Sequence, residues 1–256
     1  MKENVVIIGL GHKARNGKDY TATYMSRMLD VKGKNNIILH WADDLYKELE
    51  NKPRKDPLIK VEPGIGGPNT IYSLLDRYEN GKAIYQIFVD TALPMLHDIM
   101  VARGITEYWG MDEKDGPMLQ FWGTDYRRRQ NNNYWIDKII DKIDRIAEKM
   151  PNEILYVFVP DTRFPNEADF LLNDNDQSFF IEVERYNADG TRFIATDRDP
   201  NHISETGLDK YIEEGKYDFI IRAKSGDTTT IEIQADRILS SIIAAYESAV
   251  FSETLT

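Results

Sequence analysis

Val5-Val6-Ile7-Ile8-Gly9-Leu10-Gly11-His12-Lys13-Ala14-Arg15-Asn16-Gly17-Lys18-Asp19 is the stretch of sequence that decides the fold. Its first four residues are β-branched, which is typical of a strand buried on both faces of a parallel sheet. After the polar, glycine-bearing part, residues 20–25 have the composition of the start of a helix. A loop at such a junction directs backbone N–H groups toward one point, where the helix N-terminus adds positive potential. The stretch therefore predicts a phosphate-binding loop.

The loop matches half of the phosphate-binding pattern G-x-x-x-x-G-K-[ST]. Gly17-Lys18 fits, but Gly11 lies one residue too early, so that His12 stands in the first glycine position. Asp19 stands where the pattern has a hydroxyl. The order strand, loop, helix favours a nucleotide phosphate site, and the alternative is an ordinary turn between a strand and a helix.

The rest of the chain alternates strand and helix patterns. Short apolar runs predict strands at 37–39, 154–159, 179–183 and 219–221. Apolar residues spaced by three and four predict helices over 135–150 and 231–243. This alternation indicates a doubly wound α/β fold with a parallel sheet. At 256 residues we expect one such domain with an inserted or appended subdomain.

Composition excludes several classes of function. The 32 Lys and Arg against 43 Asp and Glu give a net charge of −11, which disfavours binding to a nucleic-acid polymer or an anionic membrane. The chain has no cysteine, which removes disulfides and thiolate metal sites and fits a reducing compartment. The apolar run at 5–10 is shorter than the roughly 7–15 residues of a secretory core, and none approaches the about 18 of a membrane span. We expect a cytoplasmic protein, in the host cytoplasm if the chain is viral.

Two stretches interrupt the alternation. Residues 51–69 are rich in proline and glycine, and residues 185–206 are polar with arginines at 185, 192 and 198. Both are candidate lids, and the alternative for each is an ordinary surface loop.

Asp161 and Arg163 directly follow the predicted strand at 154–159. Ligands of open α/β sheets bind at the carboxyl ends of strands, so Asp161 is a candidate magnesium or water ligand. Arg163 is a candidate phosphate ligand, because a guanidinium pairs with phosphate in a bidentate way. The alternative is that Asp161 caps a helix starting near Pro165 and Arg163 pairs with Glu167.

The segment Gln120-Phe121-Trp122-Gly123-Thr124-Asp125-Tyr126-Arg127-Arg128-Arg129 is a candidate seat for an anionic small molecule. The alternative is a solvated arginine run. Trp135 either stacks a base or fills the core, and its place in an apolar stripe favours the core. The four histidines lack metal-ligand spacing and there is no G-x-S-x-G motif, so a Ser-His-Asp hydrolase is disfavoured. Phosphoryl transfer needs neither feature.

Taken together, these segments resemble the deoxynucleoside monophosphate kinases of tailed bacteriophages, in the P-loop NMP-kinase-like group. The matching pieces run in family order over residues 5 to about 222. They are Gly17-Lys18-Asp19, Gln120 with Gly123-Thr124-Asp125, Tyr134-Trp135, Val159-Pro160-Asp161-Thr162-Arg163 with Glu167, and His202-Ile203-Ser204-Glu205-Thr206-Gly207-Leu208.

The resemblance implies a P-loop NTPase three-layer fold with a mostly parallel sheet, a helical acceptor-binding insertion at about 45–120 and a lid at about 185–206. It implies magnesium-dependent transfer of a phosphoryl group from ATP to a deoxynucleoside 5′-monophosphate, and kinases of this kind suggest a homodimer. The implied catalytic residues are Lys18, Asp161 and Arg163, and the implied metal ligands are Asp19 and Asp161. The implied ATP-binding residues are Lys13, Ala14, Arg15, Asn16, Gly17, Lys18, Asp19, Tyr20 and Arg198. The implied acceptor-binding residues are Asp43, Lys47, Gln120, Gly123, Thr124, Arg128, Trp135, Arg163 and Glu167.

The chain departs from this family at Tyr20, which replaces a threonine, and a rigid phenol cannot put its oxygen where a threonine hydroxyl would be. The segment Ala42-Asp43-Asp44-Leu45-Tyr46-Lys47 resembles an acceptor-phosphate segment of related kinases, and Asp43 serves equally well as a helix cap. Arg127 or Arg129 are alternatives to Arg128. Two rival functions stay open. One is a kinase of a phosphorylated metabolite that is not a nucleotide, and the other is a nucleotide-binding module without catalysis. The aromatic residues Trp122, Tyr126 and Trp135 favour a planar base as acceptor.

Overall fold

The computed structural model describes residues 3–53, 55, 57–62, 70–73, 93–173, 177–196, 201 and 203–253. The chain divides into two compact units. Unit 1 comprises Met1–Trp41 and Ile139–Thr256, and unit 2 comprises Ala42–Lys138. Unit 2 is thus an insertion in the sequence of unit 1, and its bounds enclose the predicted acceptor-binding insertion at 45–120.

Unit 1 is built on a five-stranded parallel sheet with the strand order β2-β6-β1-β7-β8. Each predicted strand is confirmed, and every residue of the central strand β1 is buried, as its β-branched composition requires. The strands are β1 Val5–Gly11, β2 Asn35–Ile38, β6 Leu155–Thr162, β7 Ser178–Tyr186 and β8 Phe219–Lys224.

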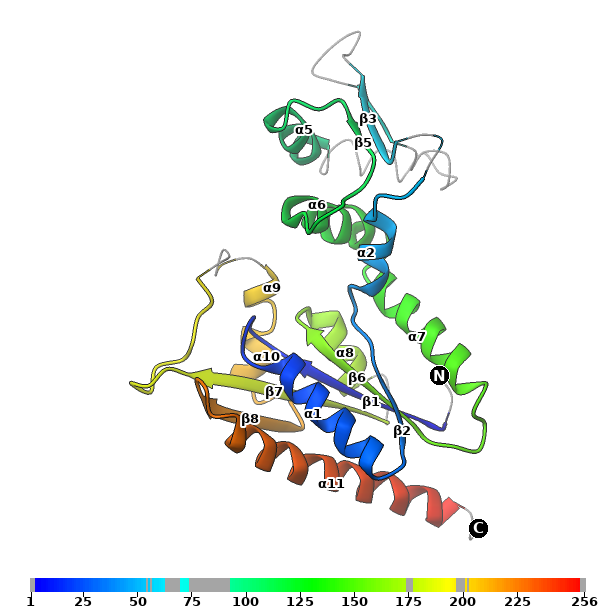
Figure 1. Cartoon of the computed structure of the whole chain (residues 1–256), viewed down its shortest axis with the longest axis vertical. Helices are drawn as coiled ribbons and strands as arrows, with labels where there is room; N and C mark the ends of the chain where they lie inside the picture. The colour runs from blue at the N-terminus through cyan, green and yellow to red at the C-terminus, as the bar shows by residue number, and fades with distance from the viewer. Residues whose placement is uncertain are drawn as a thin grey trace. The chain divides into compact units, whose positions relative to one another are not determined.

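Helices cover both faces of this sheet (Figure 1). The helices α1 (Lys18–Val31) and α11 (Thr228–Glu253) pack side by side on one face, where Met25 and Leu239 belong to one buried cluster with alternate residues of the strands. On the other face, α8 (Pro165–Leu172) packs so closely that a Cβ on Gly9 would lie 2.1 Å from Leu171 Cδ1. Two short helices, α9 (Ile203–Thr206) and α10 (Asp209–Glu213), precede β8. With the loop between β1 and α1, this is the three-layer α/β fold of P-loop NTPases.

Unit 2 combines helices with a small antiparallel sheet of order β4-β3-β5. Its core includes Leu49, Trp122 and Trp135. The predicted helical insertion thus also contains strands, and the part of 51–69 that is described includes β3 rather than only irregular backbone. The elements are α2 Asp43–Leu49, β3 Ile59–Glu62, β4 Thr70–Ser73, α5 Leu93–Ala102, β5 Glu107–Tyr108, α6 Gly116–Gln120, the π-helix η2 Phe121–Arg128 and the start of α7 Tyr134–Ala147.

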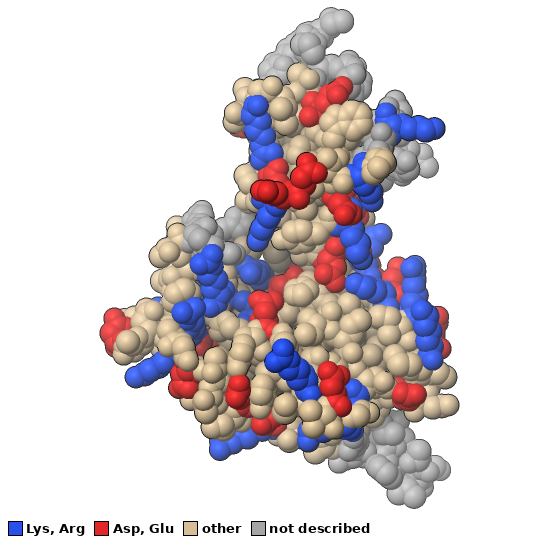
Figure 2. Space-filling model, in the orientation of Figure 1, with Lys and Arg blue, Asp and Glu red and all other residues tan. Residues whose placement is uncertain are grey.

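The surface in view carries acidic and basic side chains interspersed over each unit (Figure 2). None of the described helices combines the length and the apolar character that crossing a bilayer requires.

Candidate functional site

The predicted phosphate loop connects the end of β1 at Gly11 to the start of α1 at Lys18. Gly17 precedes the helix with φ of 96°, in the left-handed region that favours glycine. Gly11 is required for a different reason, because a Cβ there would lie 2.5 Å from Phe180 Cε2 and 3.1 Å from the Thr162 carbonyl oxygen. Arg15 also has a positive φ, of 57°, which is uncommon for a residue with a side chain. The loop is therefore held in a special conformation at the carboxyl edge of the sheet.

Lys18 is the central cation of this loop, and it is only 4 % exposed. Its ammonium donates a hydrogen bond to the carbonyl of Lys13. Burial, together with the nearby positive charge of Arg163, lowers the pKa of Lys18 to about 7. Since a buried ammonium is costly, an arriving phosphate would stabilise its charged form.

The carboxylates of Asp19, Glu205 and Asp161 act on Lys18 in the opposite direction, each raising its pKa. Asp19 and Asp161 are the predicted metal ligands. A hydrogen bond with His40, whose Nε2 lies 3.5 Å from Asp19 Oδ1, lowers the pKa of Asp19. Asp161 Oδ1 accepts the backbone N–H of Trp41 at 2.9 Å. The two carboxylates are therefore both within electrostatic range of one ammonium.

Magnesium is the metal that this fold family implies. Within the described part of the chain, no group of three or more His, Asp or Glu side chains is arranged to hold a metal ion. Magnesium at phosphoryl-transfer sites needs only one or two carboxylates, because substrate phosphates and water complete its octahedron. Asp19, with a side chain 81 % exposed, and Asp161 are oxygen donors of the right kind, so the residues fit this metal.

The structure separates the two interpretations of Asp161 and Arg163. Helix α8 begins at Pro165, and the residue that satisfies its first turn is Glu167, which is buried. Glu167 Oε2 accepts the backbone N–H groups of Arg163 at 2.8 Å and Phe164 at 3.0 Å. The guanidinium of Arg163 instead bonds the Glu205 carboxylate, with 2.7 Å between Nη1 and Oε1. Thus Glu167 binds the backbone N–H of Arg163, whereas the side chain of Arg163 binds Glu205.

Tyr20 does not direct its hydroxyl to the position of the missing threonine. Its phenol oxygen donates a hydrogen bond to Glu232 of α11, and this bond raises the pKa of Tyr20. The ring is 40 % exposed.

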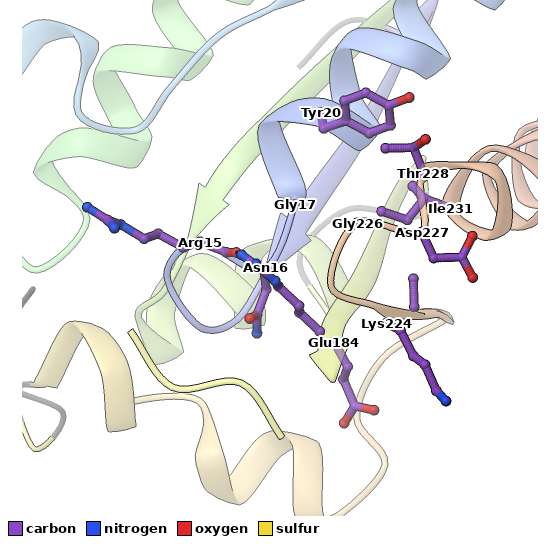
Figure 3. Close-up of a pocket in the computed structure, with 12 residues that line it drawn as sticks. Arg15, Asn16, Gly17, Tyr20, Glu184, Lys224, Gly226, Asp227, Thr228 and Ile231 are labelled. Carbon is purple, nitrogen blue, oxygen red and sulfur yellow. The ribbon is translucent and has the colours of Figure 1, made fainter. Parts of the chain in front are cut away.

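A cavity of about 230 Å³ adjoins the phosphate loop (Figure 3). In Figure 3, Tyr20 of α1 lies opposite Thr228 and Ile231 of α11. The volume of the cavity is below the roughly 300–1,000 Å³ of a complete small-molecule site, so the cavity suits one ring system of a larger ligand. Its lining residues are Arg15, Asn16, Gly17, Tyr20, Glu184, Arg185, Ala223, Lys224, Gly226, Asp227, Thr228 and Ile231.

Sequence reasoning missed the half of this cavity that comes from the turn between β8 and α11. The available signal was Ser225-Gly226-Asp227, a second glycine-bearing turn between a strand and a helix. Asp227 is committed to the helix, because it accepts the backbone N–H of Thr230 at 3.0 Å and its hydroxyl at 2.7 Å. A ligand in the cavity would therefore contact the apolar side chain of Ile231, whereas the Asp227 carboxylate is already hydrogen-bonded to Thr230.

Of the predicted lid residues, the structure describes only part. Arg192 forms an ion pair with Glu184. Arg185 bonds the Arg15 carbonyl at 3.2 Å and Ser225 Oγ at 2.8 Å, and so connects the phosphate loop to the end of β8. Arg198 and His202 lie outside the described residues.

Most of the predicted acceptor residues belong to unit 2, in and around α2 and η2. These two elements pack together, since a Cβ on Gly123 would lie 2.9 Å from Leu45 Cδ2. Asp43 is the first residue of α2, after the cap position at Ala42, and Lys47 pairs with Asp44 at 2.9 Å. The structure thus brings Asp43, Lys47, Gln120, Gly123, Thr124 and Arg128 into one region of unit 2, whereas Arg163 and Glu167 belong to unit 1.

The other two arginines of the run have partners within unit 2. Arg127 Nε bonds Glu48 Oε2 at 2.9 Å, and its guanidinium lies 4.7 Å from the ring centroid of Tyr134. Arg129 lies 3.6 Å from Asp125. Of the three candidates, Arg127 is therefore committed to the interior of unit 2.

The aromatic side chains proposed for base stacking are buried. Trp122 and Trp135 are 2 % exposed and Tyr126 is 3 % exposed. Trp135 Nε1 donates to the Gly123 carbonyl at 3.0 Å, and Trp122 Nε1 donates to Glu48 at 2.8 Å. In this conformation their ring faces belong to the core of unit 2 rather than to a ligand surface.

No known family model matches the chain, and no curated protein matches its sequence. Among solved structures, the chain is similar to a dephospho-CoA kinase from Campylobacter jejuni. The identity is 14 %, the TM-score is 0.39, and the match covers 94 % of this chain and 98 % of that one. At this level the likeness carries no functional assignment, which depends on the residues of the site.

Proposed function

We propose that the protein is a kinase that transfers the γ-phosphoryl group of ATP to a deoxynucleoside 5′-monophosphate. The observation that carries the proposal is the charged centre of unit 1. There the ammonium of Lys18 is buried at the start of α1, and Arg163, Asp19 and Asp161 all act on its pKa. Two cations for phosphate oxygens and two carboxylates for a magnesium ion are the parts that phosphoryl transfer uses.

In the proposed reaction, a phosphate oxygen of the acceptor forms a bond to the γ-phosphorus of ATP. The bond from that phosphorus to the β–γ bridging oxygen breaks, and ADP leaves with the bonding electrons. Lys18 and Arg163 stabilise the charge on the transferring group and on the departing β-phosphate, while backbone N–H groups from Arg15 to Gly17 hold the phosphates in place. The Ala14 N–H already donates to Glu205. Magnesium, held by Asp19 and Asp161 with water and phosphate, would supply further charge neutralisation.

The cavity beside the loop supports a nucleotide as donor. Its position next to Gly17 and Tyr20 suits the base or sugar of a nucleotide whose phosphates lie on the loop. The apolar side chain of Ile231 and the ring of Tyr20 provide surfaces on which a planar base packs favourably.

Two observations bear on the identity of the acceptor. The deoxynucleotide assignment is supported by the resemblance over Gln120, Gly123, Thr124 and Arg128. Burial of the three aromatic rings removes the stacking argument for a planar base. A kinase of a phosphorylated metabolite other than a nucleotide is therefore the second candidate.

The first test measures ADP production from ATP and magnesium with single acceptors. The panel contains each deoxynucleoside monophosphate, each ribonucleoside monophosphate, a set of phosphorylated sugars and cofactor precursors, and no acceptor. We expect turnover with deoxynucleotides. Turnover only with a non-nucleotide would select the second candidate, and ATP binding with no turnover on any acceptor would indicate a binding module.

The second test uses variants of the charged centre. Lys18→Ala should abolish transfer without unfolding the protein, and Arg163→Ala should reduce it by at least about a hundredfold, as loss of one charge-stabilising group does. Lys210→Ala is the matched control, since Lys210 has a side chain 81 % exposed. Near-normal turnover of Lys18→Ala would remove the phosphate-loop assignment.

A further inference from the structure

The segment formed by α9 and α10 contacts the phosphate loop through two carboxylates and one carbonyl. Glu205 Oε2 accepts the backbone N–H of Ala14 at 3.0 Å, and the Glu205 carbonyl accepts the ammonium of Lys13 at 2.5 Å. Asp209 bonds both Lys13 and the Nε2 of His12, the latter at 2.6 Å. Three consecutive loop residues, His12, Lys13 and Ala14, are thus fastened to residues about 190 positions later in the chain.

Glu205 has a second function in this contact, because its other carboxylate oxygen bonds Arg163. The Glu205 side chain is 6 % exposed and that of Arg163 is 22 % exposed, so water screens their charge-assisted bond only partly. One buried carboxylate therefore connects the loop backbone at Ala14 to the guanidinium of Arg163.

Gly207 explains how α9 comes close enough for this connection. A Cβ at position 207 would lie 2.7 Å from the Ile203 carbonyl oxygen, 3.1 Å from the Arg163 carbonyl oxygen and 3.4 Å from Pro165 Cδ. Two of these neighbours are backbone atoms, which cannot rotate away. The Arg163 carbonyl and Pro165 belong to the turn between β6 and α8, so the lack of a Cβ at position 207 lets the end of α9 lie directly against this turn, two residues after Glu205.

We infer that Glu205 is a positioning residue for phosphoryl transfer, which holds Arg163 and the phosphate loop in their working arrangement without touching the substrate. The inference rests on the proposed function. A carboxylate is needed because both of its partners, the Ala14 N–H and the Arg163 guanidinium, are donors. Glutamine offers one oxygen and one NH₂ group, so it satisfies one partner and opposes the other.

An inhibitory role for the Glu205 carboxylate, in which it blocks Arg163, would make a different prediction. If Glu205 occupied the place of a substrate phosphate at Arg163, its removal would release the guanidinium and ATP would bind more tightly. If Glu205 positions Arg163, its removal lowers the rate of transfer. The direction of the effect therefore separates the two roles.

The kinetic experiment compares Glu205→Gln with Glu213→Gln, a matched change at an exposed position of α10. We expect Glu205→Gln to lower kcat about ten- to a hundredfold, the value of one hydrogen bond to a charged group, with KM for ATP within about threefold. Glu213→Gln should change neither. A kcat within about twofold of the parent chain, or tighter ATP binding, overturns the inference.

A double variant tests whether the effect passes through Arg163. In the Arg163→Ala background, adding Glu205→Gln should cost less than it does in the parent chain, because one of the two groups that Glu205 positions is already gone and only the contact with the loop at Ala14 is left to lose. The same ten- to hundredfold loss in both backgrounds would show that no part of the effect passes through Arg163, and would overturn the inference that Glu205 positions this residue.

Hydrogen exchange at the Ala14 amide gives a readout that does not need turnover. We expect Glu205→Gln to speed exchange of the loop peptide about tenfold or more, whereas Glu213→Gln should have no effect on this peptide. If the parent chain transfers phosphate to no acceptor yet its loop responds in this way, the proposed function fails while the anchoring of the loop stands. If transfer is normal and the loop does not respond, the positioning role fails alone.

Discussion

Replacing Lys18 with methionine should stabilise the protein in the absence of nucleotide. The ammonium of Lys18 is buried, and burial together with the charge of Arg163 lowers its pKa from 10.5 to about 7. Folding at neutral pH must therefore either bury this charge or release its proton, and both are costly. Methionine has a stem of similar length and no charge, so the variant avoids this cost while losing the phosphate contact.

The magnitude follows from the two pKa values. Between pH 7 and pH 10.5 the unfolded chain holds the Lys18 proton and the folded chain does not, so stability rises with pH across this window. At about 1.4 kcal/mol per pKa unit, the penalty is about 4 kcal/mol at pH 7 and about 2 kcal/mol at pH 9. Loss of the hydrogen bond to the Lys13 carbonyl takes back about 1 kcal/mol at every pH. The net gain is therefore about 3 kcal/mol at pH 7 and about 1 kcal/mol at pH 9, by the same linkage.

The assay is urea-induced unfolding of Lys18→Met and the parent chain at pH 7, 8 and 9. The difference in the free energy of unfolding should shrink by about 2 kcal/mol over this range, since all other titrating groups cancel. Lys210→Met, at an exposed position, should stay within about 0.5 kcal/mol of the parent chain at each pH. A difference that is constant from pH 7 to pH 9 would refute the reasoning, because it would mean that Lys18 keeps its ordinary pKa in the folded loop.

Three further predictions concern other parts of the molecule. Gly11→Ala should destabilise the protein by about 1–3 kcal/mol in urea unfolding, because the new Cβ would lie 2.5 Å from Phe180 Cε2. Adding Phe180→Leu to this variant should recover part of the lost stability. Equal stability of Gly11→Ala and the parent chain would contradict the prediction. Glu48→Ala should destabilise unit 2 by about 2 kcal/mol, because Trp122, Arg127 and Tyr134 all lose the carboxylate to which they donate hydrogen bonds. Glu113→Ala should cause no such loss, and equal effects of the two changes would count against a structural role for Glu48. Asp19→Ala should reduce transfer in a way that added magnesium partly restores, and if no magnesium concentration restores it, Asp19 has a role in the loop and not at the metal.

The sequence predicts the centre of the fold because the signals there are local. Four β-branched residues followed by a glycine-bearing loop and a helix indicate a buried strand and its phosphate loop, and β1 and α1 form there. The apolar spacing over 135–150 and 231–243 likewise predicts α7 and α11, because one helix face must meet a core. These features need no knowledge of residues far away in the chain.

The partners of individual side chains were not predictable in this way. Arg163 has a carboxylate four residues away at Glu167, yet its guanidinium bonds Glu205, which reaches it only through the packing of α9. Arg127 looked like one of three equivalent arginines, but Glu48, far earlier in the sequence, selects it for the interior of unit 2. Spacing identifies the residue types of a site, whereas tertiary packing decides which of them meet.

The strand order of unit 1 has a consequence for synthesis of the chain on the ribosome. The central strand β1 is made first, yet its neighbours are β6 and β7, with Val5 paired to Leu155 and Ile7 to Ser178. At about 5–20 residues per second, the apolar strand waits roughly 7–30 seconds before its first partner emerges. Unit 2 lies wholly within that interval of sequence and has its own core, so we expect it to fold earlier. A nascent chain stalled so that residue 138 has left the ribosome while β6 is still enclosed in it should therefore contain a folded unit 2 beside an exposed β1, a natural substrate for chaperones that bind extended apolar segments.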